Sequence, residues 1–330
     1  INTGSILASG TGIQALTLNL NNTGEIIGTA SSVVTTSATS VITNLGLMSA
    51  TLGAALGTAG GRVENSGTIE TSGSFGLLSS GILSLVNTGW ITGLTNGVNI
   101  SVNSTSTSTI DNSGSIIGQN AAIVSSSALD LDNSGTISSV AGTGVTTQHF
   151  CVIDNDGLIE GMIGGPTSQD GLFLTNGGTI DGGSGMGVRV LLQSEITNTG
   201  VILGTEYAID YQSQTLGSNL TNSGTIAADA TAIAVQGASL NLVNSGTITG
   251  TTAILSELTA QAVSITNSGK ITGDVFLSGQ SDVLDTQNGI IHGDVSGRVG
   301  NDLYIIGQSN LVILEAVGEG TDEVRSTVNY

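Results

Sequence analysis

The chain is poor in several residue types on which common protein classes depend. Of its 330 residues, one is cysteine and one is proline, while aromatic residues make up 3% and charged residues 9%. The single cysteine, Cys151, rules out a disulfide bond within the chain. It lies two residues after His149, at a position where the alternation of strand residues is expected to point the side chain inward. We therefore expect a buried small hydrophobic residue rather than a catalytic thiol.

Positive charge is scarce. Lysine and arginine total five against 25 acidic residues, and the formal net charge is -20. The basic residues are Arg62, Arg189, Lys270, Arg298 and Arg325. Five scattered charges do not form a patch that follows a phosphate backbone, so nucleic-acid binding is not expected. The same shortage argues against adsorption to anionic membranes, and no apolar run is long enough for membrane insertion.

Composition favours an exported protein. A chain with one cysteine, many hydroxyl side chains and excess acid fits bacterial extracellular proteins better than eukaryotic secreted ones. The chain begins inside a repeat, at Ile1, and we expect that a targeting segment has been removed. The predicted localisation is the extracellular space or the bacterial cell surface.

One motif recurs through nearly the whole chain, and residues 265–271 (Ile-Thr-Asn-Ser-Gly-Lys-Ile) are a clear copy. Its asparagine recurs every 20 to 25 residues. Glycine follows two residues later, isoleucine stands four residues later in nearly every copy, and an aliphatic residue usually precedes the asparagine by two. A period of this length indicates a solenoid, a propeller or an array.

The spacing of these columns predicts short strands joined by corners. Aliphatic residues on both sides of the asparagine, alternating with polar ones, have the period of two expected of strands with one buried face. The glycine between them allows a positive φ, so we expect it to mark the corner. A third apolar run follows in many copies, for example residues 232–235. We therefore predict an all-β chain folded as a single-stranded parallel β-helix, a solenoid of about 14 coils with three short strands per coil.

We expect the repeat, residues 1–296, to form one elongated unit rather than two globular domains. About 14 coils stacked ~4.8 Å apart predict a rod about 65 to 70 Å long. Residues 297–330 have a different pattern and are expected to continue or cap the solenoid.

Four segments interrupt the repeat. Residues 30–40 are rich in serine and threonine, and residues 51–61 are rich in glycine and alanine, so we expect both to be loops at corners. Further interruptions are expected at residues 101–109 and at residues 161–170, which contain the only proline, Pro166.

The asparagine column has a physical explanation in stacked coils. Equivalent amides one coil apart are close enough to hydrogen-bond along the solenoid axis, whereas an isolated buried amide is costly. We predict a structural ladder rather than a ligand site, formed by Asn65, Asn87, Asn112, Asn133, Asn155, Asn176, Asn198, Asn222, Asn244 and Asn267. A leucine-rich repeat is rejected because its LxxLxL run is absent.

Acidic residues in register suggest cation sites. The candidates for Ca²⁺ are Asp274, Asp282, Asp294 and Asp302, which form two pairs each 20 residues apart. Carboxylates one coil apart repel unless a cation or water screens them, and hard oxygen ligands suit Ca²⁺. Solvated acidic corners are the alternative. Asp111, Asp132 and Asp154 precede their asparagines in three successive copies and predict an outward acidic column, which we interpret as a solvated face that limits aggregation rather than as a cation site.

The Asn-Ser-Gly-Thr-Ile repeat resembles that of bacterial secreted β-helix proteins, including autotransporter passenger and haemagglutinin-like repeats, over residues 1–295. Residues 297–304 (Gly-Arg-Val-Gly-Asn-Asp-Leu-Tyr) are similar to one nonapeptide of the secreted calcium-binding RTX proteins, although Arg298 stands where the nonapeptide has its second glycine. Residues 314–324 resemble the segment often found beside those nonapeptides. This resemblance implies type I secretion and a calcium-rich exterior.

These observations favour a non-catalytic extracellular structural protein, a rigid β-helical rod that associates with itself head to tail into a fibre, filament or layer. The partners expected are further copies of the chain and cell-surface components. An adhesin stalk that binds a surface or host ligand through loops such as residues 30–40 is the alternative. A polysaccharide-acting enzyme is less favoured, because the basic residues are scattered and Trp90, Tyr207 and Tyr211 are too few for a sugar-stacking groove.

Overall fold

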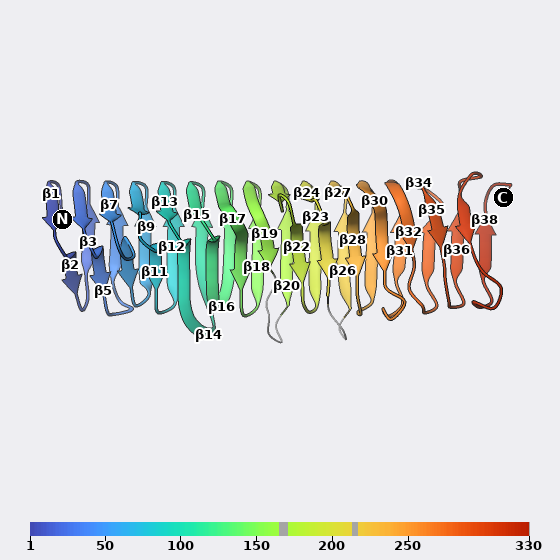
Figure 1. Cartoon of the computed structure of the whole chain (residues 1–330), viewed down its shortest axis with the longest axis horizontal. Helices are drawn as coiled ribbons and strands as arrows, with labels where there is room; N and C mark the ends of the chain where they lie inside the picture. Colours follow the sequence, from blue (N-terminus) through green and yellow to red (C-terminus); the bar gives the residue numbers. More distant parts are fainter. Residues whose placement is uncertain (165–170, 213–216, 330) are drawn as a thin grey trace. The chain divides into compact units, whose positions relative to one another are not determined.

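The computed structural model describes residues 1–164, 171–212 and 217–329. These residues form parallel strands stacked in a β-solenoid of about 14 coils, which confirms the predicted fold class. The chain divides into two compact units, Ile1–Ser168 (unit 1) and Gln169–Tyr330 (unit 2), and coils are stacked within each of them (Figure 1). Nowhere in the described part of the chain is there an apolar helix of membrane-spanning length.

Most coils contain three strands, and in some coils neighbouring strands merge into one longer strand. The strands of unit 1 are β1 (Ser5–Ala8), β2 (Thr11–Ala15), β3 (Asn19–Asn22), β4 (Glu25–Gly28), β5 (Ser31–Thr35), β6 (Val41–Asn44), β7 (Leu47–Ala50), β8 (Leu56–Thr58), β9 (Gly61–Asn65), β10 (Thr68–Thr71), β11 (Phe75–Ser79), β12 (Leu83–Asn87), β13 (Trp90–Gly93), β14 (Asn96–Asn112), β15 (Ser115–Gly118), β16 (Ala121–Asn133), β17 (Thr136–Thr147), β18 (Cys151–Asn155) and β19 (Leu158–Gly164).

Unit 2 repeats the same arrangement. Its strands are β20 (Leu172–Asn176), β21 (Thr179–Asp181), β22 (Met186–Val190), β23 (Ser194–Asn198), β24 (Val201–Gly204), β25 (Tyr207–Tyr211), β26 (Ser218–Asn222), β27 (Thr225–Ala228), β28 (Thr231–Val235), β29 (Leu240–Asn244), β30 (Thr247–Ser256), β31 (Ser264–Asn267), β32 (Lys270–Phe276), β33 (Val283–Thr286), β34 (Ile290–His292), β35 (Asp294–Ser296), β36 (Leu303–Ile306), β37 (Val312–Leu314) and β38 (Glu323–Ser326).

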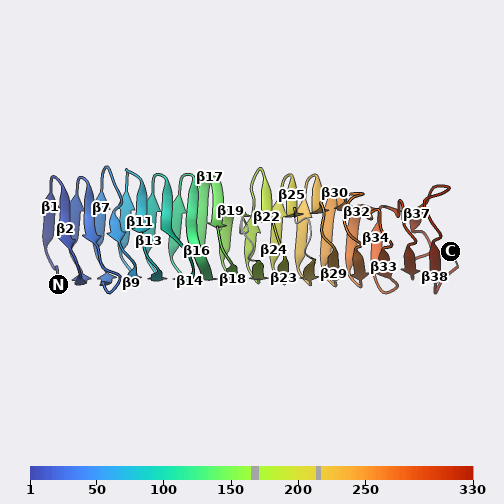
Figure 2. The same ribbon diagram turned by 90° about the horizontal axis from the view of Figure 1, so that it is seen from below.

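The register repeats from coil to coil. In unit 1, β9 pairs in parallel with β12, and Asn65 lies opposite Asn87. In unit 2, β26 pairs in parallel with β29, and Asn222 lies opposite Asn244. Figure 2 shows the strands of successive coils stacked within each unit. Pairing continues past residue 297, since β33 pairs with β36 and β36 pairs with β38. The change in sequence pattern at residue 297 is therefore not a break in strand pairing.

The interior of each unit is built from the two aliphatic columns that flank the asparagine. Every member of the column two residues before it, from Leu20 to Ile265, is at most 4% exposed. The column four residues after it is at most 1% exposed from Ile26 to Ile291. Burial of one such side chain contributes about 1.5 to 3 kcal/mol relative to exposure. This repeated burial explains why the columns stay in register over so many copies.

Two of the expected loops are in part strands of the solenoid wall. Residues 31–35 form β5, in which Ser32, Val33 and Thr35 are buried, and β5 pairs with β2 and β8. Residues 51–61 include β8, and Ala55 and Leu56 are fully buried. The loop prediction was wrong for these buried residues, because serine, threonine and alanine are small enough to fill the interior near a corner, where composition alone resembles a loop. Residues 36–40 and 51–55 do lie outside the strands, as predicted.

The other two interruptions have different outcomes. Residues 101–109 lie within β14, where two register shifts against β16 leave most of the segment exposed. The segment is thus an extended strand carrying an irregularity. The interruption expected at residues 161–170 falls largely outside the described residues, since residues 165–170 are not described.

The glycine that follows each asparagine has a different role from the one expected. No described glycine in this column has a positive φ; positive values occur at Gly60, Gly61, Gly161, Gly183, Gly273, Gly300 and Gly318. A Cβ added to a glycine of this column would instead clash with the equivalent glycine one coil earlier. At Gly24 it would lie 2.0 Å from Gly4 O, and at Gly224 it would lie 2.1 Å from Gly200 O. Glycine is required here because stacked backbones approach closely, and the expectation of a positive φ was wrong.

Candidate functional site

The asparagine column is a hydrogen-bonded ladder that runs through the interior of each unit. Except for Asn2, each asparagine of the ladder is the last residue of its strand, and within each unit successive asparagines are joined by a bond from Nδ2 of one to Oδ1 of the next. In unit 1 the bonds join Asn2, Asn22, Asn44, Asn65, Asn87, Asn112, Asn133 and Asn155 at 2.7 or 2.8 Å. In unit 2 they join Asn176, Asn198, Asn222, Asn244 and Asn267 at 2.8 Å.

Each amide in the ladder also supports the corner beside it. Asn65 Nδ2 donates to Gly67 O at 3.2 Å in its own corner and to Trp90 O at 3.2 Å in the next coil. The ladder of unit 2 ends where Asn267 Nδ2 donates to Thr286 Oγ1 at 3.2 Å. These amides are buried and have protein partners along the axis, so they hold coils together and present no free group to a ligand.

Asp111, Asp132 and Asp154 form the outward acidic column that the sequence suggests. Asp111 pairs with Asp132, Asp132 pairs with Asp154 in the strand register, and all three are exposed. The pKa of Asp132 is raised, first by partial burial of its carboxyl and then by the charges of Asp130, Asp154 and Asp111. The column therefore carries mutual repulsion at neutral pH.

Asp132→Asn is expected to raise the melting temperature of unit 1 at pH 8 by at most about 2 °C, because it removes the middle charge of the column. A raised folded-state pKa means that the repulsion is relieved as pH falls through that pKa, so the gain should disappear near pH 3. Thermal unfolding of both proteins at several pH values measures this. Asp156→Asn, an exposed position in the same unit outside the column, is the control. An equal gain at both pH values would contradict the assignment.

The four aspartates predicted to bind Ca²⁺ form two separate pairs in unit 2, Asp274 with Asp294 and Asp282 with Asp302. Asp294 N donates to Asp274 Oδ1 at 3.0 Å, and neither residue is buried. Asp282 is buried, and its carboxylate accepts from Val263 N at 2.7 Å and from the backbone and side chain of Ser278. Burial raises the pKa of Asp282, and these bonds oppose the shift. Its oxygens are thus already used by the protein.

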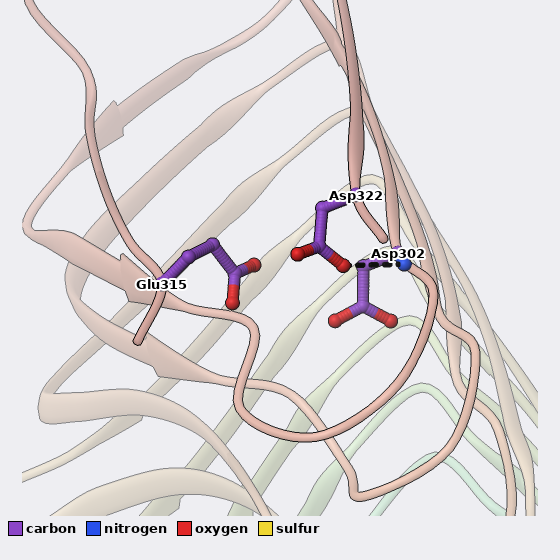
Figure 3. A group of neighbouring side chains, drawn as sticks. All are labelled: Asp302, Glu315 and Asp322. Carbon is purple, nitrogen blue, oxygen red and sulfur yellow. Dashed lines mark hydrogen bonds between the residues drawn. The ribbon is translucent and has the colours of Figure 1, made fainter. Parts of the chain in front are cut away.

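Asp302 is different, because half of its buried carboxylate has no hydrogen-bond partner. Its Oδ1 accepts from Asp282 N at 2.8 Å, but Oδ2 has none, although the residue is only 2% exposed. Asp302 N in turn donates to Asp322 Oδ1 at 3.0 Å (Figure 3). Burial of the carboxyl raises the pKa of Asp302 to about 7, with a further contribution from the carboxylates of Asp282, Glu315 and Asp322.

Asp302, Glu315 and Asp322 form a cluster, which we call the carboxylate cluster. One oxygen from each lies within 4.8 Å of the others. Figure 3 shows Glu315 facing the two aspartates from a separate segment of chain. Tyr304 OH donates to Glu315 Oε1, and a Cβ at Gly297 would lie 2.8 Å from Asp302 Oδ2. Glycine at position 297 therefore leaves the space in which these oxygens meet.

Of this cluster, only Asp302 was predicted from the sequence. Within the described residues, no group of three metal-ligating side chains includes Asp274, Asp282 or Asp294. Glu315 and Asp322 were missed, although Asp322 follows Asp302 by the same 20 residues that separate Asp282 from Asp302. That spacing was the available signal for Asp322. Glu315 had none, because it reaches the cluster from a different wall of the coil.

Arg298 does not belong to the carboxylate cluster. Its Nη1 donates to Ser256 O at 2.5 Å and to Leu277 O at 3.1 Å, and its guanidinium lies 5.1 Å from the ring centre of Phe276. Its φ of 67° lies in the left-handed region that favours glycine. Arg298 thus closes a corner and neutralises charge near Asp282.

Other candidate groups have structural roles. Cys151 is 1% exposed and burial raises its pKa to about 12, so its thiol is protonated at neutral pH, which confirms the buried small residue expected. His149 Nε2 hydrogen-bonds to Asn103 Oδ1 at 2.7 Å on the surface. Both carboxylate oxygens of buried Asp210 accept bonds, from Gln212 Nε2 at 2.6 Å and from Gln236 Nε2 at 3.0 Å.

A shallow groove of about 340 Å³ in unit 2 is lined by residues that include Asp181, Thr205 and Asp229, and its described lining contains no basic or aromatic side chain. Comparison of the chain with protein-family models, with curated proteins and with solved structures gave no match.

Proposed function

We propose that this chain is a non-catalytic structural protein of a bacterium, exported to the extracellular space or cell surface, in which the solenoid is a stiff scaffold. The asparagine ladder is the observation that carries the proposal. It joins successive coils by buried hydrogen bonds in addition to the backbone pairing, so bending a unit requires breaking both. The buried asparagine amides thus hold successive coils together.

We propose further that copies of the chain stack head to tail. β1 and β2 pair with β4 and β5 of the following coil, while β3 also pairs with Asn2 on its other side. A coil placed before β1 and β2, from preceding chain or from a second copy, would pair with their other edge. Ile1, Leu7 and Leu16 beside this edge are 92%, 72% and 73% exposed. In this proposal β38 of a second copy supplies the neighbouring strand edge, and such a contact does not close on itself but extends into a filament.

Gly4→Ala separates stacking from folding. A Cβ at Gly4 meets nothing within 4 Å, whereas a Cβ on Gly24 would lie 2.0 Å from Gly4 O. The substitution is therefore expected to leave the melting temperature unchanged but to block a second copy from stacking in the same register. Negative-stain electron microscopy and sedimentation at increasing concentration measure assembly, and Gly185→Ala is the control. Monomers at every concentration of the unmodified chain, or filaments unaffected by Gly4→Ala, would overturn the stacking proposal.

The non-catalytic part of the proposal has its own assay. Incubation with common polysaccharides is expected to release no reducing ends and no unsaturated sugars, because the chain offers few aromatic or basic groups to bind a sugar acid. Any release that Asp181→Asn or Asp229→Asn abolishes would replace the structural proposal with an enzymatic one located at the groove.

An adhesin is the second candidate, favoured by the exposed part of β14. Residues 101–107 are rich in serine and threonine, are mostly exposed, and interrupt the register with β16. A polar extended segment of this kind can offer backbone and hydroxyl groups to a surface ligand. Deletion of residues 102–107 should leave the fold intact. Loss of bacterial adhesion with assembly preserved would favour the adhesin, while unchanged adhesion would reject this segment as its site.

A further inference from the structure

We propose that Asp302, Glu315 and Asp322 bind a hard divalent cation, Ca²⁺ in the first instance, that fastens the last coils of unit 2. The inference starts from the buried and unpartnered Oδ2 of Asp302, which lies within the carboxylate cluster. A buried carboxylate oxygen without a donor is costly, and a cation removes that cost.

The cluster has no positive side chain to balance it. Arg298 is held by Ser256 O and Leu277 O, and Arg325 forms an ion pair with Glu323 at 2.7 Å. The remaining basic residues, Arg62, Arg189 and Lys270, belong to earlier coils. Among the described residues, three carboxylates therefore converge with no cation from the protein itself.

The backbone already orients two of the three carboxylates. Asp302 Oδ1 accepts from Asp282 N and Asp322 Oδ1 accepts from Asp302 N, so each carboxylate is fixed through one oxygen and can offer the other. Tyr304 OH fixes Glu315 in the same way through Oε1. Such positioning by outer hydrogen bonds is typical of metal ligands.

The chemistry of the donors selects the class of cation. All three groups are carboxylates, without sulfur or imidazole, and hard oxygen donors favour Ca²⁺ and related ions over zinc or copper. Glu315 is exposed and Asp322 half-buried, so one side of the cluster is accessible to an ion and to the water that completes its coordination.

The site also links separate segments. Asp302 precedes β36, Glu315 follows β37 and Asp322 precedes β38. A bound ion would thus tie the coil that contains β36 to the final strand of the chain, where strand burial is least: all four residues of β38 are exposed. Ion binding is therefore expected to stabilise these last strands most.

Thermal unfolding of the full chain with excess CaCl₂ or excess chelator, at matched ionic strength, tests the proposal. Calcium is expected to raise the melting temperature of unit 2 by about 5 °C. Glu315→Gln and Asp322→Asn, which keep shape and remove one charge each, should weaken calcium binding at least about tenfold. Asp294→Asn removes an equally accessible charge from the same unit and should keep the shift.

Terbium replaces calcium in such sites, and its luminescence is sensitised by a nearby tyrosine. This emission reports cation binding directly, and a purely structural role of the three carboxylates would not produce it. Tyr304 is expected to sensitise its emission and excess calcium should remove that emission. Glu315→Gln and Asp322→Asn should lose the emission, whereas Asp294→Asn should keep it. No calcium effect, or the same effect in Glu315→Gln and Asp322→Asn as in the unmodified chain, would overturn the site. If calcium left the melting temperature unchanged but lower pH raised it, the cluster would hold a shared proton and not a cation.

Discussion

Gly224→Ala is expected to lower the free energy of unfolding of unit 2 by about 3 kcal/mol or more, the upper part of the range for overpacked sites. The added Cβ would lie 2.1 Å from Gly200 O and 2.6 Å from Thr199 C, both backbone atoms of the preceding coil. Neither atom can rotate away, so the coils must separate locally and weaken the pairing of β24 with β27. Urea denaturation followed by circular dichroism measures the loss.

The matched control for this substitution is Gly185→Ala. At Gly185 the nearest atom to an added Cβ is Gly182 O at 3.8 Å, and φ is not in the left-handed region. Alanine there should be neutral, or should stabilise the unit by up to about 1 kcal/mol through the unfolded chain. Similar losses at the two positions would mean that backbone flexibility, and not the close approach of coils, explains the glycine column.

Asn222→Ala is expected to destabilise unit 2 by about 3 kcal/mol. Asn222 is fully buried, accepts from Asn198 Nδ2 at 2.8 Å and donates to Asn244 Oδ1 at 2.8 Å. Alanine removes both bonds, together with those from Asn222 Nδ2 to Gly224 O and Thr247 O, and it leaves the buried Oδ1 of Asn244 without its donor in the ladder. The loss is read from the same denaturation experiment and should fall on the coils on either side.

Asn219→Ala on the same strand, β26, is the control, because Asn219 is exposed and its bond from Asn241 Nδ2 is long, at 3.4 Å. Its effect is expected to stay within about 0.5 kcal/mol. If Asn219→Ala lowered the free energy of unfolding as much as Asn222→Ala does, the strand propensity of asparagine would explain the recurring asparagines better than the hydrogen-bonded ladder.

Much of the fold could be predicted because residues that contact each other in a solenoid recur in the sequence at the repeat length. Leu220 and Leu242 occupy the same column 22 residues apart, and in the structure they are opposite each other in the register. A neighbour one coil away is then found by counting, with no knowledge of long-range folding. The ladder was accessible in the same way, since buried asparagines at one period have only each other as regular partners.

Prediction failed where the deciding quantity was the distance between backbones or the size of a side chain. Gly24 was expected to take a positive φ, but the distance to the coil beneath it is what requires glycine. Ser32 and Ala55 were assigned to loops from composition, yet both are buried in the wall, because only the packed interior reveals that small residues are needed there.

The sequence by itself determined which residues face inward and which lie above one another, because both follow from periodicity. Only the tertiary structure decided which carboxylates meet. Asp302 and Asp322 share a column, but Glu315 comes from another wall of the coil, and no period relates positions on different walls. Their meeting depends on how each corner turns, and a corner's path is set by packing in three dimensions and not by the repeat.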